Sequence, residues 1–394
     1  MPFLIPVLAL AIFAQGTSEF MLAGLLIPLA SDLGVSPATA GLLTSAFAVG
    51  MVIGAPAMAA VGSRWHPRRS LVLLLIVFIA AHIVGVLAPS FELLLVTRVV
   101  AALANAGFLA ISLATVRALV PAARTTRAIA ALLAGTTLAT IVGVPGGAAL
   151  ASAFGWRATF WAVVLLCVPA LAALLLNRSL AGVTDAPRLE LRREVAALAR
   201  GPVLTAMVLA VLVNAATFGV FTFLGVVGVE VGVAEPAVPV MLAVFGVGAF
   251  LGVTATGRWA APVERLWVGL GAVALTAAWA ATAVLGLSAA GLNTAGLFVA
   301  AALGGALSFA VGSALIARIV REASDAPVLG GAFATVALNL GAALGPVAAG
   351  SAFEAAGAPG VLGAASVATG LAALIAAIAI RLTGASGAPA QPRR

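Results

Sequence analysis

The chain has 394 residues, of which 63% are hydrophobic and only 8% are charged. Soluble proteins carry charge on about a quarter of their residues, so this composition excludes a soluble globular domain and predicts a chain that is solvated by the bilayer. A net charge of +8 does not indicate nucleic-acid binding here, because the arginines are dispersed over six loops without aromatic residues between them.

Long apolar runs divide the chain into about twelve segments, each near the ~20 residues that a helix needs to cross the hydrocarbon core. The expected spans are roughly 4–29, 39–61, 70–88, 93–116, 128–151, 159–177, 202–227, 238–257, 266–287, 293–316, 329–352 and 360–380. The first run resembles a signal-peptide core, but it lacks a basic start and continues past Gly16, so we expect it to be retained as a span.

One long polar stretch lies near the middle of the chain and predicts a linker between two groups of six spans. The expected organisation is a six-helix half at 1–177, a cytoplasmic linker at 178–201, a second six-helix half at 202–380 and a cytoplasmic tail at 381–394.

The arginines predict the orientation of these spans in the membrane. All twenty basic residues are arginine, and eighteen of them lie in alternate gaps between the apolar runs, the exceptions being Arg98 and Arg157. Short loops rich in arginine stay cytoplasmic during insertion, so we expect both termini on the inner side of the cell membrane. The opposite gaps are acidic, with Asp32, Glu92, Glu230, Glu235 and Glu354.

The two groups of spans are sequence repeats. Residues 47–54 in the second span recur as 245–252 in the eighth, an offset of 198, and the fourth and tenth spans align at an offset of 200. An even number of spans in each half means that both copies enter the membrane in the same direction. This arrangement is typical of parallel-repeat transporters with a site at the midplane between the halves.

Two charged residues, Glu19 and Arg98, fall inside predicted spans. An intramembrane charge costs roughly 2.5–3.5 kcal/mol on insertion scales, so both side chains should face the bundle interior, where such residues mark a pathway or a proton relay. The alternative is a structural ion pair between the two. The repeat places Thr217 and Phe298 at the equivalent positions, so charge is confined to the first half.

Several segments resemble one membrane protein family. They are Gln15–Leu25, Gly143–Gly147, Gly155–Arg157 and Ala337–Pro346. Together they resemble the twelve-span drug:proton antiporters of the major facilitator superfamily, with the strongest likeness to actinobacterial chloramphenicol-resistance exporters. The resemblance implies an all-α polytopic membrane protein with twelve transmembrane helices in two six-helix parallel-repeat halves.

The chain departs from the family pattern at three places. Arg64 stands where the loop between spans 2 and 3 normally has an aspartate, so this loop lacks the carboxylate of the family pattern at that position. Val144 interrupts the Gly-Pro pair of span 5, and Ala101 and Ala102 replace the Gln and Gly that usually follow the arginine of span 4.

The resemblance implies proton-coupled efflux of a small amphipathic drug by alternating access, and hence antibiotic resistance, with chloramphenicol or related phenicols as the expected substrate. The alternatives are an exporter of a sugar, a nucleoside or another metabolite and, in a different class, a non-transporting membrane scaffold or sensor. The expected partners are the drug, protons and the lipid bilayer, and the expected state is a monomer.

Roles in this mechanism fall to three groups of residues. Glu19 would carry the proton, and Arg98 would bias its exchange. The candidate drug contacts are Gln15, Asn105, Phe108, Asn214, Phe218, Phe221 and Asn339. Each buried Asn can equally serve as a hydrogen bond between helices. The candidate conformational residues are Gly143, Pro145, Gly345, Pro346, Arg68 and Arg69.

The sequence argues against an enzyme. Without any lysine the chain cannot supply a P-loop lysine or a Schiff base, and we expect no cofactor. Two histidines and one cysteine do not make a metal site. His82, alone in the third span, is either a packing residue or a proton relay, and His66 in a basic loop is expected to be solvated.

Overall fold

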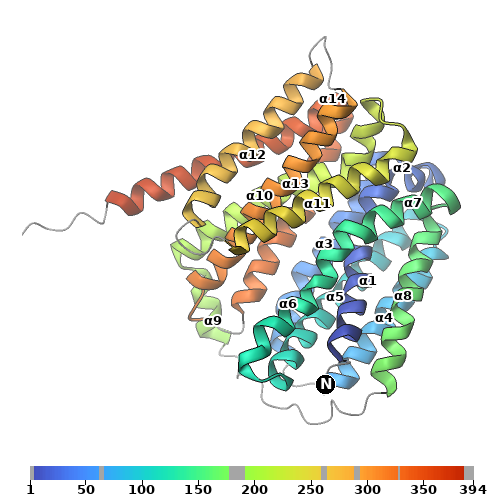
Figure 1. Ribbon diagram of the computed structural model, residues 1–394, viewed down its shortest axis with the longest axis vertical. Helices are drawn as coiled ribbons and strands as arrows, with labels where there is room; N and C mark the ends of the chain where they lie inside the picture. The colour runs from blue at the N-terminus through green and yellow to red at the C-terminus, as the bar shows by residue number, and fades with distance from the viewer. Residues whose placement is uncertain are drawn as a thin grey trace, which may run out of the picture.

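The computed structural model describes residues 4–61, 66–176, 191–258, 264–287, 293–326 and 329–385, and these residues form helices and short connections without any strand (Figure 1). Arg64, most of the predicted linker (178–190) and the end of the predicted tail (386–394) lie outside the described residues.

The first half contains six spans. Its helices are α1 (Leu4–Phe20), α2 (Leu22–Leu33), α3 (Pro37–Val61), α4 (Pro67–Val86), α5 (Phe91–Leu119), α6 (Ala122–Leu138), the π-helical η2 (Ala139–Gly143), α7 (Val144–Phe154) and α8 (Trp156–Leu176). α1 and α2 form one span that is bent by 52° at Met21. α6, η2 and α7 together form the fifth span, at 127–154.

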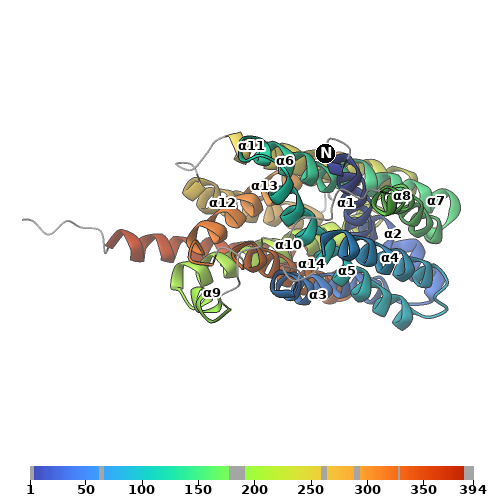
Figure 2. The same ribbon diagram turned by 90° about the horizontal axis from the view of Figure 1, so that it is seen from below.

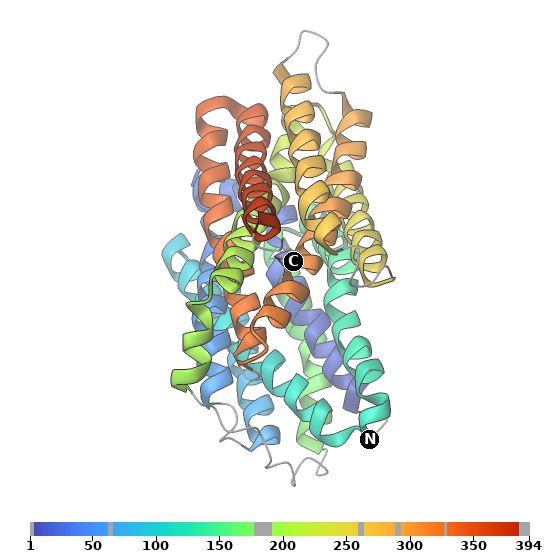
Figure 3. The same ribbon diagram turned by 90° about the vertical axis from the view of Figure 1, so that its left-hand side faces the viewer.

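The second half repeats this order after a short linker helix, α9 (Leu191–Leu198). Its elements are α10 (Gly201–Glu230), the 3₁₀ turn η3 (Glu235–Ala237), α11 (Val238–Arg258), α12 (Glu264–Leu287), α13 (Thr294–Glu322) and α14 (Gly330–Ala385). The backbone of α14 leaves the helical region at Ala356 and Gly357, where the chain turns back on itself (Figure 3). α14 therefore contains two spans, which brings the total to the predicted twelve.

Local sequence explains where equivalent helices begin. The side chain of Ser90 accepts a hydrogen bond from the Leu93 N–H at the start of α5, and Asn293 accepts one from the Gly296 N–H at the start of α13. Both residues are preferred N-caps because they satisfy a backbone donor that the first turn leaves free. Spans 4 and 10, which align in the repeat, thus begin in the same way.

The repeat is also visible in the backbone conformation. Among the described residues, positive φ angles occur at Gly34 (64°), Gly155 (81°), Gly232 (95°) and Gly357 (62°). Gly34 and Gly232 follow the first span of each half at an offset of 198, and Gly155 and Gly357 precede the last span of each half at an offset of 202. Glycine reaches this region without steric cost, so the same two turns are built in both halves.

Small residues bring spans 2 and 8 close to spans 4 and 10. A Cβ on Gly248 or Gly252 would lie 2.2 Å or 2.0 Å from the carbonyl oxygen of Ala302 or Ala306 in α13. Such small-xxx-small spacing lets backbones approach where lipid supplies no hydrophobic force between helices.

The two halves lie side by side and meet along α2, α3 and α7 of the first half and α10, α11 and α14 of the second (Figure 2). Gly350 in α14 packs on Ala38 in α3, and the ring of Phe223 in α10 packs on Gly41. Ser36 also donates a hydrogen bond of 3.1 Å to Glu354 across this interface. The bend in span 1 lies close to this interface, between the two halves.

Candidate functional site

Glu19 lies one residue before the end of α1 and is partly exposed, whereas the neighbouring Ser18 is fully buried. The side-chain amide of Asn105 in α5 donates a hydrogen bond of 3.3 Å to Oε2 of Glu19. The same amide nitrogen lies 3.6 Å from the sulfur of Met51 in α3. The carboxyl group therefore has one neutral donor from the protein and retains access to its surroundings.

Arg98 is 1% exposed and is bound to the end of α1. Its guanidinium donates to the Ser18 hydroxyl at 2.8 Å and to the Ser18 carbonyl at 2.7 Å, and it lies 4.5 Å from the centre of the Phe47 ring. Because α1 ends at Phe20, its last carbonyls need partners outside the helix, and a cation is favoured there by the helix dipole. Arg98 thus fastens α5 to the bend of span 1.

Glu19 and Arg98 lie near each other without direct contact. Among the ion pairs of the described residues, none joins the two side chains within 4.0 Å. Arg98 instead holds the residue next to Glu19.

The Ser18 hydroxyl continues this network into α4. Its oxygen lies 2.6 Å from Nε2 of His82, and Nδ1 of the same ring lies 2.8 Å from the carbonyl oxygen of Phe78. The His82 ring packs against Phe78 and Phe160, with centroid distances of 4.2 Å and 5.6 Å. The buried network therefore joins spans 1, 3 and 4.

An aromatic cluster begins at the residue after Glu19 and crosses between the halves. The ring of Phe20, the residue after Glu19, lies 5.8 Å from Phe218 and 6.4 Å from Phe221 in α10. Phe221 lies 4.9 Å from Phe245 in α11, which contacts Phe309 in α13 at 6.3 Å. These five rings, Phe20, Phe218, Phe221, Phe245 and Phe309, are called the aromatic cluster below.

The other predicted drug contacts have different surroundings. Gln15 is fully buried one turn before Glu19, and neither polar atom of its amide has a hydrogen-bond partner. Phe108 is also fully buried. Asn214 donates to the Leu338 carbonyl at 2.6 Å and so joins α10 to α14, while Asn339 donates to the Thr335 carbonyl of its own helix at 3.0 Å.

The predicted conformational glycines lie at close approaches between equivalent spans. A Cβ on Gly143 would lie 2.1 Å from Oγ1 of Thr17, where span 5 crosses span 1. A Cβ on Gly345 would lie 2.2 Å from the Ala215 carbonyl, where span 11 crosses span 7. Pro145 lies in the first turn of α7, directly after the π-helical turn, and Pro346 lies inside α14.

The two predicted loop arginines differ in their contacts. Arg68 donates to the carbonyls of Leu174, at 3.2 Å, and Leu175 at the end of α8, so it ties the start of span 3 to the end of span 6 within one half. Arg69 is exposed.

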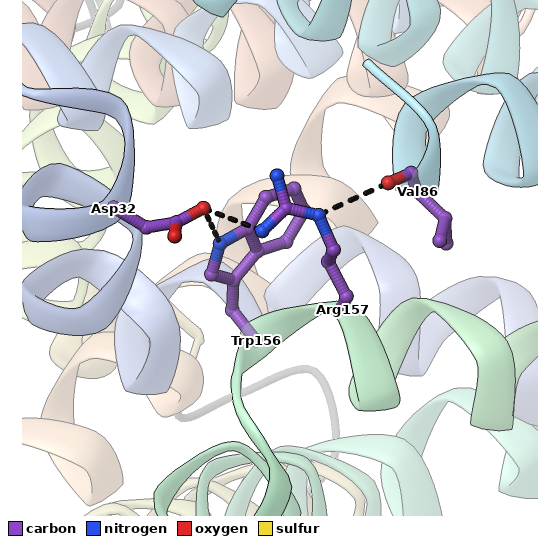
Figure 4. A network of polar contacts seen from close by, with 4 residues as sticks. All are labelled: Asp32, Val86, Trp156 and Arg157. Carbon is purple, nitrogen blue, oxygen red and sulfur yellow. Dashed lines mark hydrogen bonds and ion pairs between the residues drawn. The ribbon is translucent and has the colours of Figure 1, made fainter. Parts of the chain in front are cut away.

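A second polar network lies at the predicted outer end of the first half (Figure 4). The carboxylate of Asp32 accepts hydrogen bonds from the Trp156 indole at 3.0 Å and from Arg157 at 2.5 Å. Arg157 also donates to the Val86 carbonyl at 3.1 Å, and its guanidinium lies 4.3 Å from the Trp156 ring centre. The network joins the ends of spans 1, 3 and 6.

The fold and this site together define a class of protein. Twelve membrane-spanning helices in two parallel repeats, with a carboxyl group inside the first span and an aromatic cluster between the halves, form the architecture of a secondary transporter. The sequence model of the Major Facilitator Superfamily matches residues 8–297. The chain belongs to this superfamily and is a multi-pass protein of the plasma membrane.

Named relatives agree with this assignment over most of their length. A protein called chloramphenicol resistance protein from Streptomyces lividans is 48% identical over 352 residues, which cover 88% of each chain. The inner membrane transport protein YdhP of Escherichia coli (strain K12) is 32% identical over 354 residues, 89% of each chain.

Solved structures show the same fold. A bacterial homologue of the human lysosomal transporter Spinster, in its inward-facing and unoccupied conformation, has a TM-score of 0.78 at 19% identity and covers 99% of both chains. Its inward-facing and occupied conformation has a TM-score of 0.74, covering 96% of this chain and 97% of that one.

Sequence reasoning missed four residues of the site: Ser18, Phe20, Phe245 and Phe309. The repeat contained a signal for two of them. Phe20 aligns with the predicted contact Phe218 at the offset of 198, and Phe245 aligns with Phe47 at the same offset. No sequence signal pointed to Ser18, because its role depends on the end of α1 at the bend.

Proposed function

We propose that this chain exports chloramphenicol or a related phenicol from the cell, in exchange for protons that enter by the same site. The observation that carries the proposal is the position of Glu19, a partly exposed carboxyl group inside a span, one residue before the aromatic cluster begins at Phe20. The name of the Streptomyces lividans relative supports the phenicol substrate. The chain is thus assigned transport and no enzymatic role.

We propose that proton and drug compete at this site. Consecutive side chains of a helix point in different directions, so the drug would span from the Phe20 ring to the Glu19 carboxyl group across the end of α1. Alternating access changes the water around Glu19, and a carboxyl group changes its protonation when its solvation and its neighbouring charges change. Arg98 favours release of the proton by its positive charge, and the Asn105 amide stabilises the carboxylate that remains.

A phenicol suits the surroundings of Glu19. Chloramphenicol is a neutral molecule with one nitrophenyl ring, two hydroxyl groups and an amide. Its ring would stack against Phe218 and Phe221, and its polar groups would meet Gln15, whose buried amide has no protein partner. Small-molecule sites typically combine such an apolar lining with a few polar groups.

The conformational roles are part of the same proposal. Gly143 and Gly345 let spans 5 and 11 pass close to spans 1 and 7, and Pro145 and Pro346 remove helical hydrogen bonds beside them, which permits bending. Arg68 and Arg69 lie at the predicted inner end of span 3, where they would guide the movement of the first half.

We also assign the division into halves at 1–177 and 202–380, a monomeric state, and a cytoplasmic position for both termini and the linker. Labelling of single cysteines from outside intact cells, in a Cys167→Ser background, tests the orientation. A cysteine beside Glu354 should react and one beside Arg193 should not. Reaction at Arg193 alone would reverse the topology.

Transport is tested in vesicles that contain the purified protein. An imposed pH gradient should drive chloramphenicol against its concentration gradient, and addition of chloramphenicol should release protons from the protein in detergent. A susceptibility panel on cells that express the chain separates phenicols from sugars and nucleosides. If the cells resist none of the drugs and the vesicles move a metabolite against its concentration gradient, that metabolite and not a phenicol is the substrate. Drug binding without any flux would indicate a sensor.

A further inference from the structure

His82 is buried in α4 with 2% of its surface exposed, and it is not among the residues assigned to proton exchange or drug binding. It faces α1 through Ser18 and packs on α8 through Phe160. A buried imidazole without a polar partner would be costly, and here both ring nitrogens have one.

The partners fix the direction of each hydrogen bond. The Phe78 carbonyl can only accept, so Nδ1 of His82 carries the hydrogen. In the neutral ring Nε2 is then an acceptor, and the Ser18 hydroxyl must donate to it. The remaining lone pairs of the Ser18 oxygen face Arg98, which donates to it. The chain of donors therefore runs from Arg98 through Ser18 and His82 to Phe78.

A proton on Nε2 of His82 would change the directions of these hydrogen bonds. The Ser18 oxygen would then receive two donors, its own hydrogen would lose the histidine as acceptor, and a second cation would face Arg98 across one hydroxyl. The charged and titratable groups around Ser18 are Arg98 from α5 and Glu19 from α1, while α8 contributes the Phe160 ring and α3 the Phe47 ring. His82 is thus suited to hold a hydrogen-bond pattern and poorly suited to carry a proton.

We infer that His82 is a positioning residue of the Glu19 site: it orients the Ser18 hydroxyl and thereby fixes the Arg98 guanidinium beside the carboxyl group. This inference rests on the proposed proton exchange at Glu19. With the histidine acceptor removed, the Ser18 hydroxyl turns to another acceptor, and Arg98 keeps only its bond to the Ser18 carbonyl. A guanidinium that is held less firmly acts less strongly on Glu19, so the pH dependence of transport changes.

The experiment measures drug-driven proton release and vesicle transport across a pH series for purified wild type, four single variants and the Ser18→Ala/His82→Leu double variant. His82→Leu removes the acceptor, whereas His82→Gln places an amide oxygen near the position of Nε2. Ser18→Ala removes the same link from the other side. Thr282→Val is the control, because Thr282 is buried in α12 and its hydroxyl bonds only its own helix, at the Ala278 carbonyl.

We expect His82→Leu and Ser18→Ala each to move the midpoint of the pH profile upward by about one unit, which corresponds to the loss of one charge-assisted hydrogen bond. His82→Gln should return the midpoint most of the way to the wild-type value, and Thr282→Val should leave it in place. The double variant should shift no further than either single one, because both remove one link.

The outcomes separate this inference from the proposed function. Wild type that releases no protons on drug addition overturns both. Wild-type release with an unmoved midpoint in Ser18→Ala and His82→Leu overturns the positioning role alone. If His82→Leu does not fold, the test depends on the midpoints of Ser18→Ala and His82→Gln, and an unmoved midpoint in Ser18→Ala overturns the positioning role. A His82→Gln midpoint that is displaced as far as that of Ser18→Ala means that the ring itself exchanges the proton.

Discussion

Span 1 has Ser18, Glu19 and Phe20 in sequence at its bend, and span 7 has Ala216, Thr217 and Phe218 at the equivalent positions of the repeat. The ring centroids of Phe20 and Phe218 lie 5.8 Å apart across the two halves. At the preceding position, Glu19 of the first half corresponds to Thr217 of the second. The Thr217 hydroxyl donates a hydrogen bond to the Val213 carbonyl of its own helix. The duplicated fold has thus kept the ring on both sides and the charge on one.

The predicted outer ends of the halves show the opposite relation, because both copies have an acidic residue there. Asp32 ends span 1 and binds the side chains of Trp156 and Arg157 at the start of span 6. Glu230, its equivalent at the end of span 7, accepts the backbone N–H of Ala358 at the start of span 12, at 3.1 Å. The same connection is made with side-chain donors in one half and a backbone donor in the other.

The largest effect is expected from Glu19→Gln, which removes the one carboxyl group that lies inside a span of the first half and has a hydroxyl, Thr217, as its counterpart in the second. Gln keeps the shape of the side chain but does not titrate, so uphill export and resistance should fall to background while binding of a neutral phenicol remains. Binding by calorimetry and transport in vesicles measure the two separately. Thr217→Val, the matched change in the second half, should transport normally. Drug-driven proton release from Glu19→Gln at the wild-type level would place the proton elsewhere, with Asp32 as the next candidate.

Arg98→Ala is expected to have the second largest effect. Transport should fall at least about tenfold in protein that still inserts, since one or two charge-assisted hydrogen bonds are lost. Arg98→Lys should recover only part of the activity, because an ammonium does not reproduce the two-pronged contact with Ser18. Phe298→Ala, at the equivalent position of the second half, is the control. Full activity in a well-expressed Arg98→Ala protein would show that the arginine is not needed for coupling.

Phe218→Ala tests the part of the site that both halves share. Loss of one ring from the aromatic cluster should weaken phenicol binding about tenfold and leave the pH dependence of transport unchanged, since aromatic pairs contribute roughly 0.5–1.5 kcal/mol beyond the buried area. Phe20→Ala should weaken binding by a similar factor. A change in pH dependence with unaltered affinity would contradict the separation of drug and proton contacts.

The smallest effects are expected at the outer connections. Asp32→Asn should lower the free energy of unfolding by less than about 1 kcal/mol, because the Asp32 and Arg157 side chains are 45% and 41% exposed and water screens their pair. Glu230→Gln should have an effect of the same size. Thermal melting in detergent, with transport as a second measurement, checks both. A transport loss in Asp32→Asn equal to that of Glu19→Gln would give the outer acid a role in coupling.

The sequence predicted the fold well because each span is a long apolar run and the arginines mark one side. The twelve spans, the parallel repeat and the family are confirmed. The bend at Met21 was not predicted, since neither proline nor glycine occupies that position. The π-helical turn at Ala139–Gly143 was also not predicted, although Gly143 and Pro145 were candidate conformational residues.

At the site, sequence reasoning found the residue types and missed most of their partners. Glu19 and Arg98 stood out because charge is rare inside spans, and their roles remain predictions. The Ser18 network and the Phe20 contact depend on how α1, α4 and α5 are rotated against one another, and a single sequence contains no measure of that rotation. Asn214 shows the reverse case, in which a candidate drug contact is engaged in a bond between helices.

The turn at Ala356 and Gly357 has a mechanical consequence. Two extended residues reach at most about 7 Å, so spans 11 and 12 are coupled without slack at that end. The Glu230 carboxylate holds the next residue, Ala358, to the end of span 7. We therefore expect a tilt of span 11 to be transmitted to spans 7 and 12 together, and span 7 contains Phe218 and Phe221 of the aromatic cluster.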